Sequence, residues 1–119
     1  MATFSKLKLS GSSDGRQIKV VATSSPGTTI HTAVAGVTEG IFDEIWLYAY
    51  NSHSADVLLT LQWGGTASPD DDVKVSIPYQ QGRFLVVAGE ILQNTTLLRA
   101  YATVGSVILI SGYVNAIRA

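Results

Sequence analysis

The chain has 119 residues, no cysteine, a net charge of −1 and only 14% charged residues. This length predicts one domain with a single hydrophobic core, and the absence of cysteine excludes disulfides, thiol nucleophiles and cysteine-bound zinc. The charged fraction lies well below the roughly 25% of an average soluble domain, so much of the surface is neutral or apolar. Burial against partners would explain this composition; solvation by serine and threonine hydroxyls is the alternative.

The N-terminal segment, residues 1–14, is rich in serine and glycine. We expect a flexible arm outside the core here, with residues 15–119 forming the sandwich domain. The arm and the first strand hold four of the eight basic residues, whereas residues 20–73 contain no lysine or arginine. The arm, with Phe4, Lys6 and Lys8 as contact candidates, could therefore dock on an acidic partner or a neighbouring copy. Deleting residues 1–11 is expected to weaken attachment and to leave the fold intact.

Targeting signals are not evident. The N-terminal residues lack an apolar stretch of signal-peptide length, and no apolar run is long enough to span a bilayer. We therefore expect a soluble protein that is not secreted and does not bind a membrane.

Apolar residues recur with a period of two along most of the chain, which predicts β-strands. In chain order, strands are expected at residues 16–22, 28–34, 43–52, 56–63, 73–77, 84–88, 97–103 and 106–115. Turn residues separate these runs, for example SSPG at 24–27 and GGTASPDDD at 64–72. Eight strands at this spacing predict an all-β, single-domain antiparallel β-sandwich that resembles a jelly roll.

Two segments need separate interpretation. Residues 89–102, GEILQNTTLLRAYA, are the one helical competitor, but their Asn-Thr-Thr centre has poor helix propensity. We predict a loop followed by a strand. Residues 84–88 are a continuous apolar run, which is typical of a strand covered on both faces.

The segment DEIWLYAYNS, residues 43–52, has two apolar rows. As a strand it points Ile45, Leu47 and Ala49 to one side. The other side receives Trp46, Tyr48 and Tyr50. One row can pack in the sandwich core, and the other then has to meet another chain. The sequence does not determine which row does which. Burying each aromatic side chain would stabilise an oligomer by roughly 1.5–3 kcal/mol.

The aromatic residues also permit a different functional interpretation. Trp46, Tyr48, Tyr50 and Trp63 could form a sugar-stacking platform, with Gln62 as a polar neighbour. We favour a subunit interface for these four residues, because tyrosine and tryptophan combine a large apolar area with a polar tip.

Catalytic and metal-binding patterns are weak. His31 and His53 lie 22 residues apart, which does not fit a paired-histidine metal site, and His31 is expected to be a partly buried, hydrogen-bonded side chain. No GxSxG turn presents a serine nucleophile. Asp43 and Glu44 are adjacent on a strand and face opposite sides, so they cannot share a substrate. The aspartates at 70–72 lack the EF-hand spacing and suit a solvated turn better than calcium. We expect no enzyme activity, metal or cofactor, and the sparse basic residues do not predict nucleic-acid binding.

Three stretches carry a resemblance to a known group of proteins. They are TTIHTAVAGVTEGIFDEIWLYAYNS at 28–52, LLTLQWGGTASPDDDVKVSIP at 58–78 and ILISGYVN at 108–115. Together they resemble small structural proteins of tailed bacteriophages, of the capsid decoration or cement type, over residues 9–117. No residue-level motif transfers from that family.

The resemblance implies a β-sandwich, often a trimer, that binds the major capsid protein on the outside of the phage head and stabilises it. Localisation would then be the virion, after assembly in the host cytoplasm. A carbohydrate-binding module of a fibre or tail is one alternative, and a neck or tail β-sandwich is another.

Overall fold

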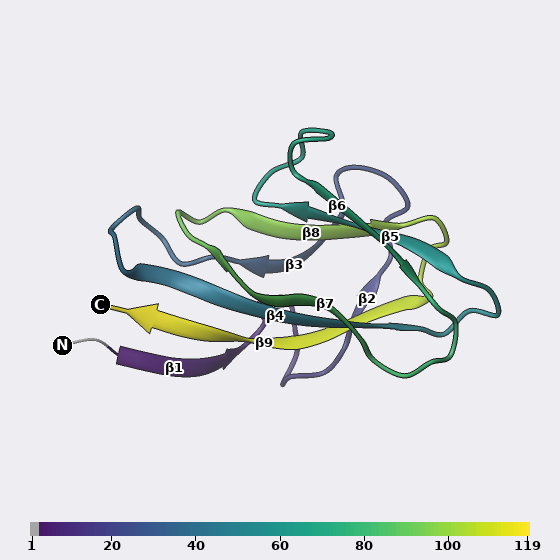
Figure 1. Cartoon of the computed structure of the whole chain (residues 1–119), viewed down its shortest axis with the longest axis horizontal. Helices are drawn as coiled ribbons and strands as arrows, with labels where there is room; N and C mark the ends of the chain where they lie inside the picture. Colours follow the sequence, from purple (N-terminus) through teal and green to yellow (C-terminus); the bar gives the residue numbers. More distant parts are fainter. Residues whose placement is uncertain (1–2) are drawn as a thin grey trace.

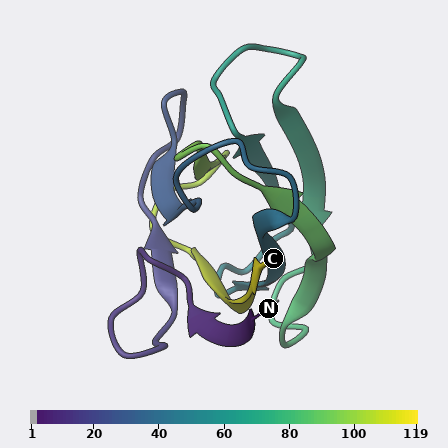
Figure 2. The same ribbon diagram turned by 90° about the vertical axis from the view of Figure 1, so that its left-hand side faces the viewer.

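The computed structural model describes residues 3–119, which form nine β-strands and no helix. The strands are β1 (Thr3–Lys8), β2 (Ile18–Val20), β3 (Thr28–Thr32), β4 (Ile41–Asn51), β5 (Val57–Trp63), β6 (Asp72–Ile77), β7 (Phe84–Leu92), β8 (Leu97–Ala102) and β9 (Ile108–Arg118). Figure 1 shows them in two layers, and Figure 2 shows the layers from one end. The prediction of an all-β antiparallel sandwich is confirmed.

The first sheet has the strand order β1-β9-β4-β7, with the short β2 also paired to β9. The second sheet has the order β3-β8-β5-β6. Most successive strands therefore lie in opposite layers, and the first and last strands pair with each other. This arrangement is the jelly-roll connectivity that the strand count predicted.

Strand β4 lies in the interior of the first sheet, between β9 and β7. Its apolar residues Ile45, Leu47 and Ala49 are fully buried, whereas the alternating Trp46, Tyr48 and Tyr50 are half-buried on the opposite face. The structure thus shows which of the two rows faces the core. The small aliphatic side chains fill the space between the sheets, and the bulky aromatic ones lie outside.

The core between the layers is aliphatic. Both sheets contribute to it, and its fully buried members include Ile45 and Leu47 on β4, Leu59 and Leu61 on β5, and Ile110 on β9. On β5, Val57, Leu59, Leu61 and Trp63 share one face as predicted, with Trp63 half-buried at the end of the strand.

The N-terminal segment differs from the expected arm. Residues Thr3–Lys8 form β1, which pairs antiparallel with β9 from Thr3↔Arg118 to Lys8↔Tyr113. Leu9 is only 1% exposed and belongs to the core. The expectation that the segment lies outside the core was wrong because one edge strand with two solvated faces carries little hydrophobic signal. Residues 1–2 of the expected arm lie outside the described residues.

Strand β7 also differs from its prediction. It is an edge strand, and Phe84 and Leu85 are 40% and 46% exposed, so the run at 84–88 is not covered on both faces. The strand continues through Leu92, where a loop was expected. Its pairing with β4 shifts register twice, once at Gly89, which adopts a φ of 75°, and once at Val86. Such an irregularity breaks the alternation that sequence patterns depend on.

Candidate functional site

The outer face of the first sheet carries the largest set of aromatic side chains. Directly paired residues of neighbouring strands point to the same side, so the register arranges this face in rows. One row is Phe4, Ile117 and Phe42; the next is Lys6, Asn115, Glu44 and Ile91; the third is Lys8, Tyr113, Trp46 and Ala88. Tyr48 lies opposite Leu85 and Ser111, and Tyr50 lies opposite Leu109.

Trp46 is held from three directions. Its ring is nearly parallel to that of Tyr113, with an interplanar angle of 12° and centroids 6.1 Å apart. On the other neighbouring strand, β7, the indole lies against Gly89. A Cβ on this glycine would meet Trp46 Cζ2 at 3.1 Å. The indole Nε1 donates a hydrogen bond of 2.9 Å to Glu44 Oε1. A side chain fixed in this way loses little conformational entropy when a partner covers it.

Glu44 links two neighbouring rows of the outer face, because it accepts hydrogen bonds from Trp46 in one row and from Asn115 in its own row. Its Oε1 also accepts a hydrogen bond of 3.0 Å from Asn115 Nδ2. Hydrogen bonds to a carboxylate favour its charged form, and those from Asn115 and Trp46 lower the pKa of Glu44 below its usual 4.5. Lys6 Nζ lies 4.2 Å from the centroid of the Tyr113 ring, a cation–π contact.

The same face is bordered by apolar side chains that residues 3–119 leave exposed. Phe4 is 69% exposed and Ile91 is 53% exposed. Surface hydrophobic residues are ordinary when single, but a contiguous set marks an interaction surface. Of the predicted interface residues, the structure brings Trp46, Tyr48 and Tyr50 together on this face.

The predicted contact residues of the arm join the same surface. Phe4, Lys6 and Lys8 are exposed residues of β1 and occupy successive rows of the outer face. Lys8 Nζ donates a 3.0 Å hydrogen bond to the carbonyl of Ser12, which holds this lysine near the following loop.

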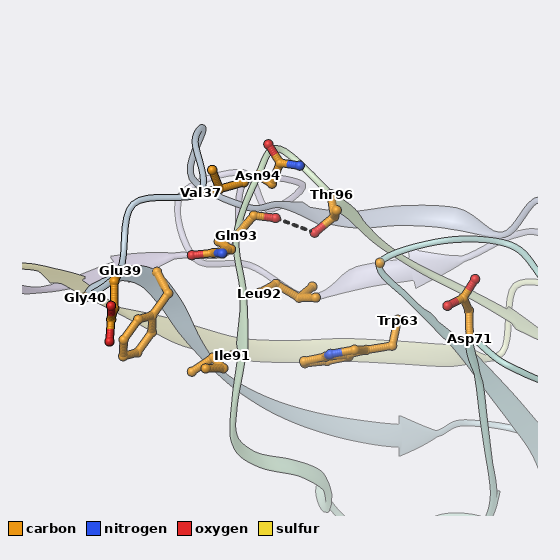
Figure 3. Close-up of a pocket in the computed structure, with 12 residues that line it drawn as sticks. Val37, Glu39, Gly40, Trp63, Asp71, Ile91, Leu92, Gln93, Asn94 and Thr96 are labelled. Atoms are coloured by element: carbon orange, nitrogen blue, oxygen red, sulfur yellow. Dashed lines mark hydrogen bonds between the residues drawn. The ribbon is translucent and has the colours of Figure 1, made fainter.

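Trp63 lies elsewhere. It comes from β5 of the second sheet and lines a cleft of about 820 Å³ with Phe42, Ile91 and Leu92. Figure 3 shows Trp63 and Ile91 on one side of this cleft and Gln93, Asn94 and Thr96 on the other. The four aromatic residues therefore do not form one platform. Trp46, Tyr48 and Tyr50 belong to the outer face, and Trp63 belongs to the cleft.

Gln62 does not flank an aromatic platform either. Its side chain is buried, where Oε1 accepts a 2.7 Å hydrogen bond from the Gly27 amide and Nε2 donates a 2.8 Å bond to Ser25 Oγ. Both ends of the amide are occupied in fixing the loop before β3. The expectation that Gln62 could be a polar neighbour of a bound sugar was therefore wrong.

A buried polar cluster lies at the end of the sandwich where β3, β4 and β9 meet. The main-chain amide of Ser10 donates to His31 Nδ1 at 3.0 Å, so Nε2 carries the proton and donates to Asp43 Oδ2 at 2.8 Å. Asp43 also accepts hydrogen bonds from Val34 N at 3.1 Å and from Arg118 Nη2 at 2.9 Å. The prediction of a hydrogen-bonded His31 is confirmed, and the side chain is more deeply buried than the partial burial that was expected.

This cluster contains a serine, a histidine and an aspartate, but the serine hydroxyl is not hydrogen-bonded to the histidine as in a catalytic triad. Ser10 contacts His31 through its main-chain amide, while its hydroxyl accepts a 2.7 Å hydrogen bond from Thr32 N. Both imidazole nitrogens are occupied, and His31 is only 4% exposed. The cluster joins the two sheets at this end.

The acidic turn is organised by its own side chains. Asp71 Oδ2 accepts a 3.0 Å hydrogen bond from Ala67 N, and Trp63 N donates to the Asp71 carbonyl at 2.8 Å. Among residues 3–119, no group of three or more histidine or acidic side chains is arranged to hold a metal ion. Nor does this part of the chain form a helix long and apolar enough to cross a membrane.

The sequence pattern did not identify several members of the outer face. Tyr113, Asn115 and Ile117 lie about 70 residues from their β4 partners and join them only through the β4–β9 register. Alternation in the C-terminal strand was visible, but its partner was not. Comparisons of the chain with family models, with curated proteins and with solved structures find no match.

Proposed function

We propose that this protein is a non-enzymatic structural protein of a phage virion, of the capsid decoration type, which self-associates through the outer face of the first sheet. The observation that carries the self-association is the stacked pair of Tyr113 and Trp46, with Tyr48 on the same face of the sheet. The indole of Trp46 is held by its stacking on Tyr113 and by its hydrogen bond to Glu44, and all three rings are only half-buried within residues 3–119. Assignment to a virion rests on the sequence resemblance to phage structural proteins.

The energetics favour association over a free surface. Burial of aromatic side chains removes apolar area from water at roughly 25 cal/mol per Å². The hydrogen bonds that orient Trp46 and Glu44 are formed inside one chain, so a partner need not replace them. A homotrimer is the expected assembly. The basic, exposed β1 strand is the proposed contact with the major capsid protein on the outside of the head.

The test replaces residues of the outer face whose side chains form no hydrogen bond with another part of the described chain. Tyr48→Arg and Leu85→Arg each place a charge in the proposed interface, where it would be desolvated without a partner. Val21→Arg is the control, because Val21 is 61% exposed and does not belong to the outer face. Sedimentation velocity should show smaller particles for the two interface variants and an unchanged size for the control. Equal sizes for all three would contradict the proposal.

A neck or tail role would use the same face and differs in its binding partner. Binding of the purified protein to expanded phage heads distinguishes these roles. A decoration protein should co-sediment with heads, and Phe4→Ser and Lys6→Gln should weaken that binding. Co-sedimentation with tails and not with heads would reject the decoration role.

A further inference from the structure

A cleft lies at one end of the sandwich, where β5 and β7 end. We call it the Trp63 cleft, after the residue that separates it from a smaller hollow between β6 and β7. Its volume of about 820 Å³ falls within the range of pockets that bind small molecules. We propose that the Trp63 cleft binds a neutral saccharide.

The first support is the apolar side of the cleft. It is formed by Trp63 of β5, Phe42 of β4, and Ile91 and Leu92 of β7. In Figure 3 the Trp63 indole and the Ile91 side chain follow one another along this side. An aromatic ring beside aliphatic side chains can pack against the C–H groups on one face of a pyranose ring. A fully polar ligand would gain nothing from such a surface.

The second support is the polar part of the lining. Gln93 and Asn94 lie across the cleft from Trp63 and Ile91, and Glu39 and Asp71 line it toward opposite ends. Within the described part of the chain, the side chains of Glu39, Gln93 and Asn94 form no hydrogen bond. Carboxylates accept and amides both accept and donate, so this set can pair with hydroxyl groups, which also do both. A ligand with one apolar face and several hydroxyls satisfies both sides of the cleft.

Charge narrows the ligand class. Two carboxylates, those of Glu39 and Asp71, line the cleft, and no lysine or arginine does. Phosphates, sulfated sugars and sialic acids would be repelled, because a like charge in a partly enclosed site is unfavourable. The chemistry therefore fits a neutral saccharide better than an anionic one.

The third support is the rigidity of the rim. Asn94 and Thr95 have φ angles of 63° and 57°, in the left-handed region that a β-branched residue rarely adopts. The turn is fixed to the loop after β3 by hydrogen bonds of 2.9 Å from Ala33 N to the Thr96 carbonyl and from Thr95 N to the Val34 carbonyl. Asn94 is thus presented at the rim by a turn that does not have to reorganise on binding.

The cleft is formed within one chain, but it shares Phe42 and Ile91 with the outer face. Trp63, Gln93 and Asn94 belong to the cleft and not to the rows of the outer face, so the test follows these three residues. The chain has two tryptophans, which provide an internal control. Trp63 reports on the cleft, and Trp46 reports on the outer face. In a ¹⁵N-labelled sample, each indole N–H gives its own NMR signal.

The experiment titrates the labelled protein with maltohexaose, cellohexaose, xylohexaose and chitohexaose, and with sialyllactose as the anionic control. At least one neutral oligosaccharide should shift the Trp63 indole signal and the Gln93 and Asn94 amide signals, while the Trp46 indole signal stays in place. No shift of Trp63 with any neutral probe at about 10 mM, a concentration that detects millimolar affinity, would overturn the proposal. A shift of Trp46 alone, or an equal response to sialyllactose, would also overturn it.

A matched pair of variants tests the rim. Asn94→Gly removes the amide while keeping a residue that tolerates the φ of 63°. Gln80→Gly makes the same kind of change at a φ of 54°, outside the cleft. Loss of one hydrogen bond should weaken saccharide binding by about three- to tenfold in Asn94→Gly. Affinity should be unchanged in Gln80→Gly. Equal affinities in the two variants would contradict the assignment of Asn94 to the site.

Discussion

Gly89 of β7 lies against the indole ring of Trp46, close enough that a Cβ on the glycine would meet ring atom Cζ2 at 3.1 Å. On the other neighbouring strand, a Cβ on Gly112 would overlap the carbonyl oxygen of Trp46. The two strands that flank β4 therefore leave room for this residue. The aromatic surface depends on glycines as much as on the aromatic residues themselves.

Gly89→Ala should destabilise the fold and move Trp46. Its φ of 75° costs an alanine on the order of 1–3 kcal/mol, and the added Cβ presses on the indole. Gly82→Ala is the matched control, because its φ is 74° but a Cβ there would have no neighbour within 4 Å. Thermal unfolding should show the larger loss for Gly89→Ala, by about 1 kcal/mol, together with altered tryptophan fluorescence. Equal losses would mean that Trp46 does not rest on Gly89.

Glu44 should make stability depend on pH in the acidic range. Its pKa is lowered in the folded protein by hydrogen bonds from Asn115 and Trp46. A depressed pKa contributes stability above the unfolded value of 4.5, and that stability is lost as the pH falls through the folded value. Urea unfolding between pH 6 and pH 3 should show this loss in the wild type and less of it in Glu44→Gln. Identical pH profiles would contradict the hydrogen-bonded role of Glu44.

Asp43 should be needed for folding. Asp43→Ala would leave His31 Nε2, Val34 N and Arg118 Nη2 without their acceptor at a site that is 3% exposed. Removing one partner from a buried ionic cluster typically costs about 3–5 kcal/mol. Asp56→Ala is the control, since Asp56 accepts one exposed hydrogen bond of 3.3 Å from Tyr79 N. Chemical denaturation should show a large loss for the first variant and a small one for the second. Comparable small losses would show that the cluster does not join the sheets.

The N-terminal segment should contribute to the core through Leu9. Leu9→Ala removes a side chain that is 1% exposed and should cost about 2–5 kcal/mol. Leu7→Ala, at a position that is 45% exposed, should cost much less. Denaturation midpoints distinguish the two. If Leu9→Ala were as mild as Leu7→Ala, the segment would behave as the arm that the composition suggested.

Much of the fold could be predicted from the period-two pattern, because strands with one buried face carry a clear alternation. The core row of β4 and the buried row of β5 are examples. Edge strands were harder. In β1 all six residues are exposed, and in β7 a glycine shifts the register, so neither strand shows the alternation of a half-buried strand.

The candidate site was only partly predictable for a different reason. Trp46, Tyr48 and Tyr50 are neighbours in the sequence, so their shared face follows from strand geometry. Their contacts with Tyr113 and Asn115 depend on pairing between distant strands. The position of Trp63 depends on which sheet its strand enters, and this is a property of the connectivity that no local pattern encodes.

Sedimentation equilibrium of the purified wild-type chain, over a range of salt concentrations, tests the central claim most directly. An interface dominated by aromatic and aliphatic contacts should persist at high salt, because screening acts on charges and not on apolar burial. We predict a mass close to three times 12.6 kDa at every salt concentration. A mass of 12.6 kDa throughout would contradict self-association through the outer face of the first sheet.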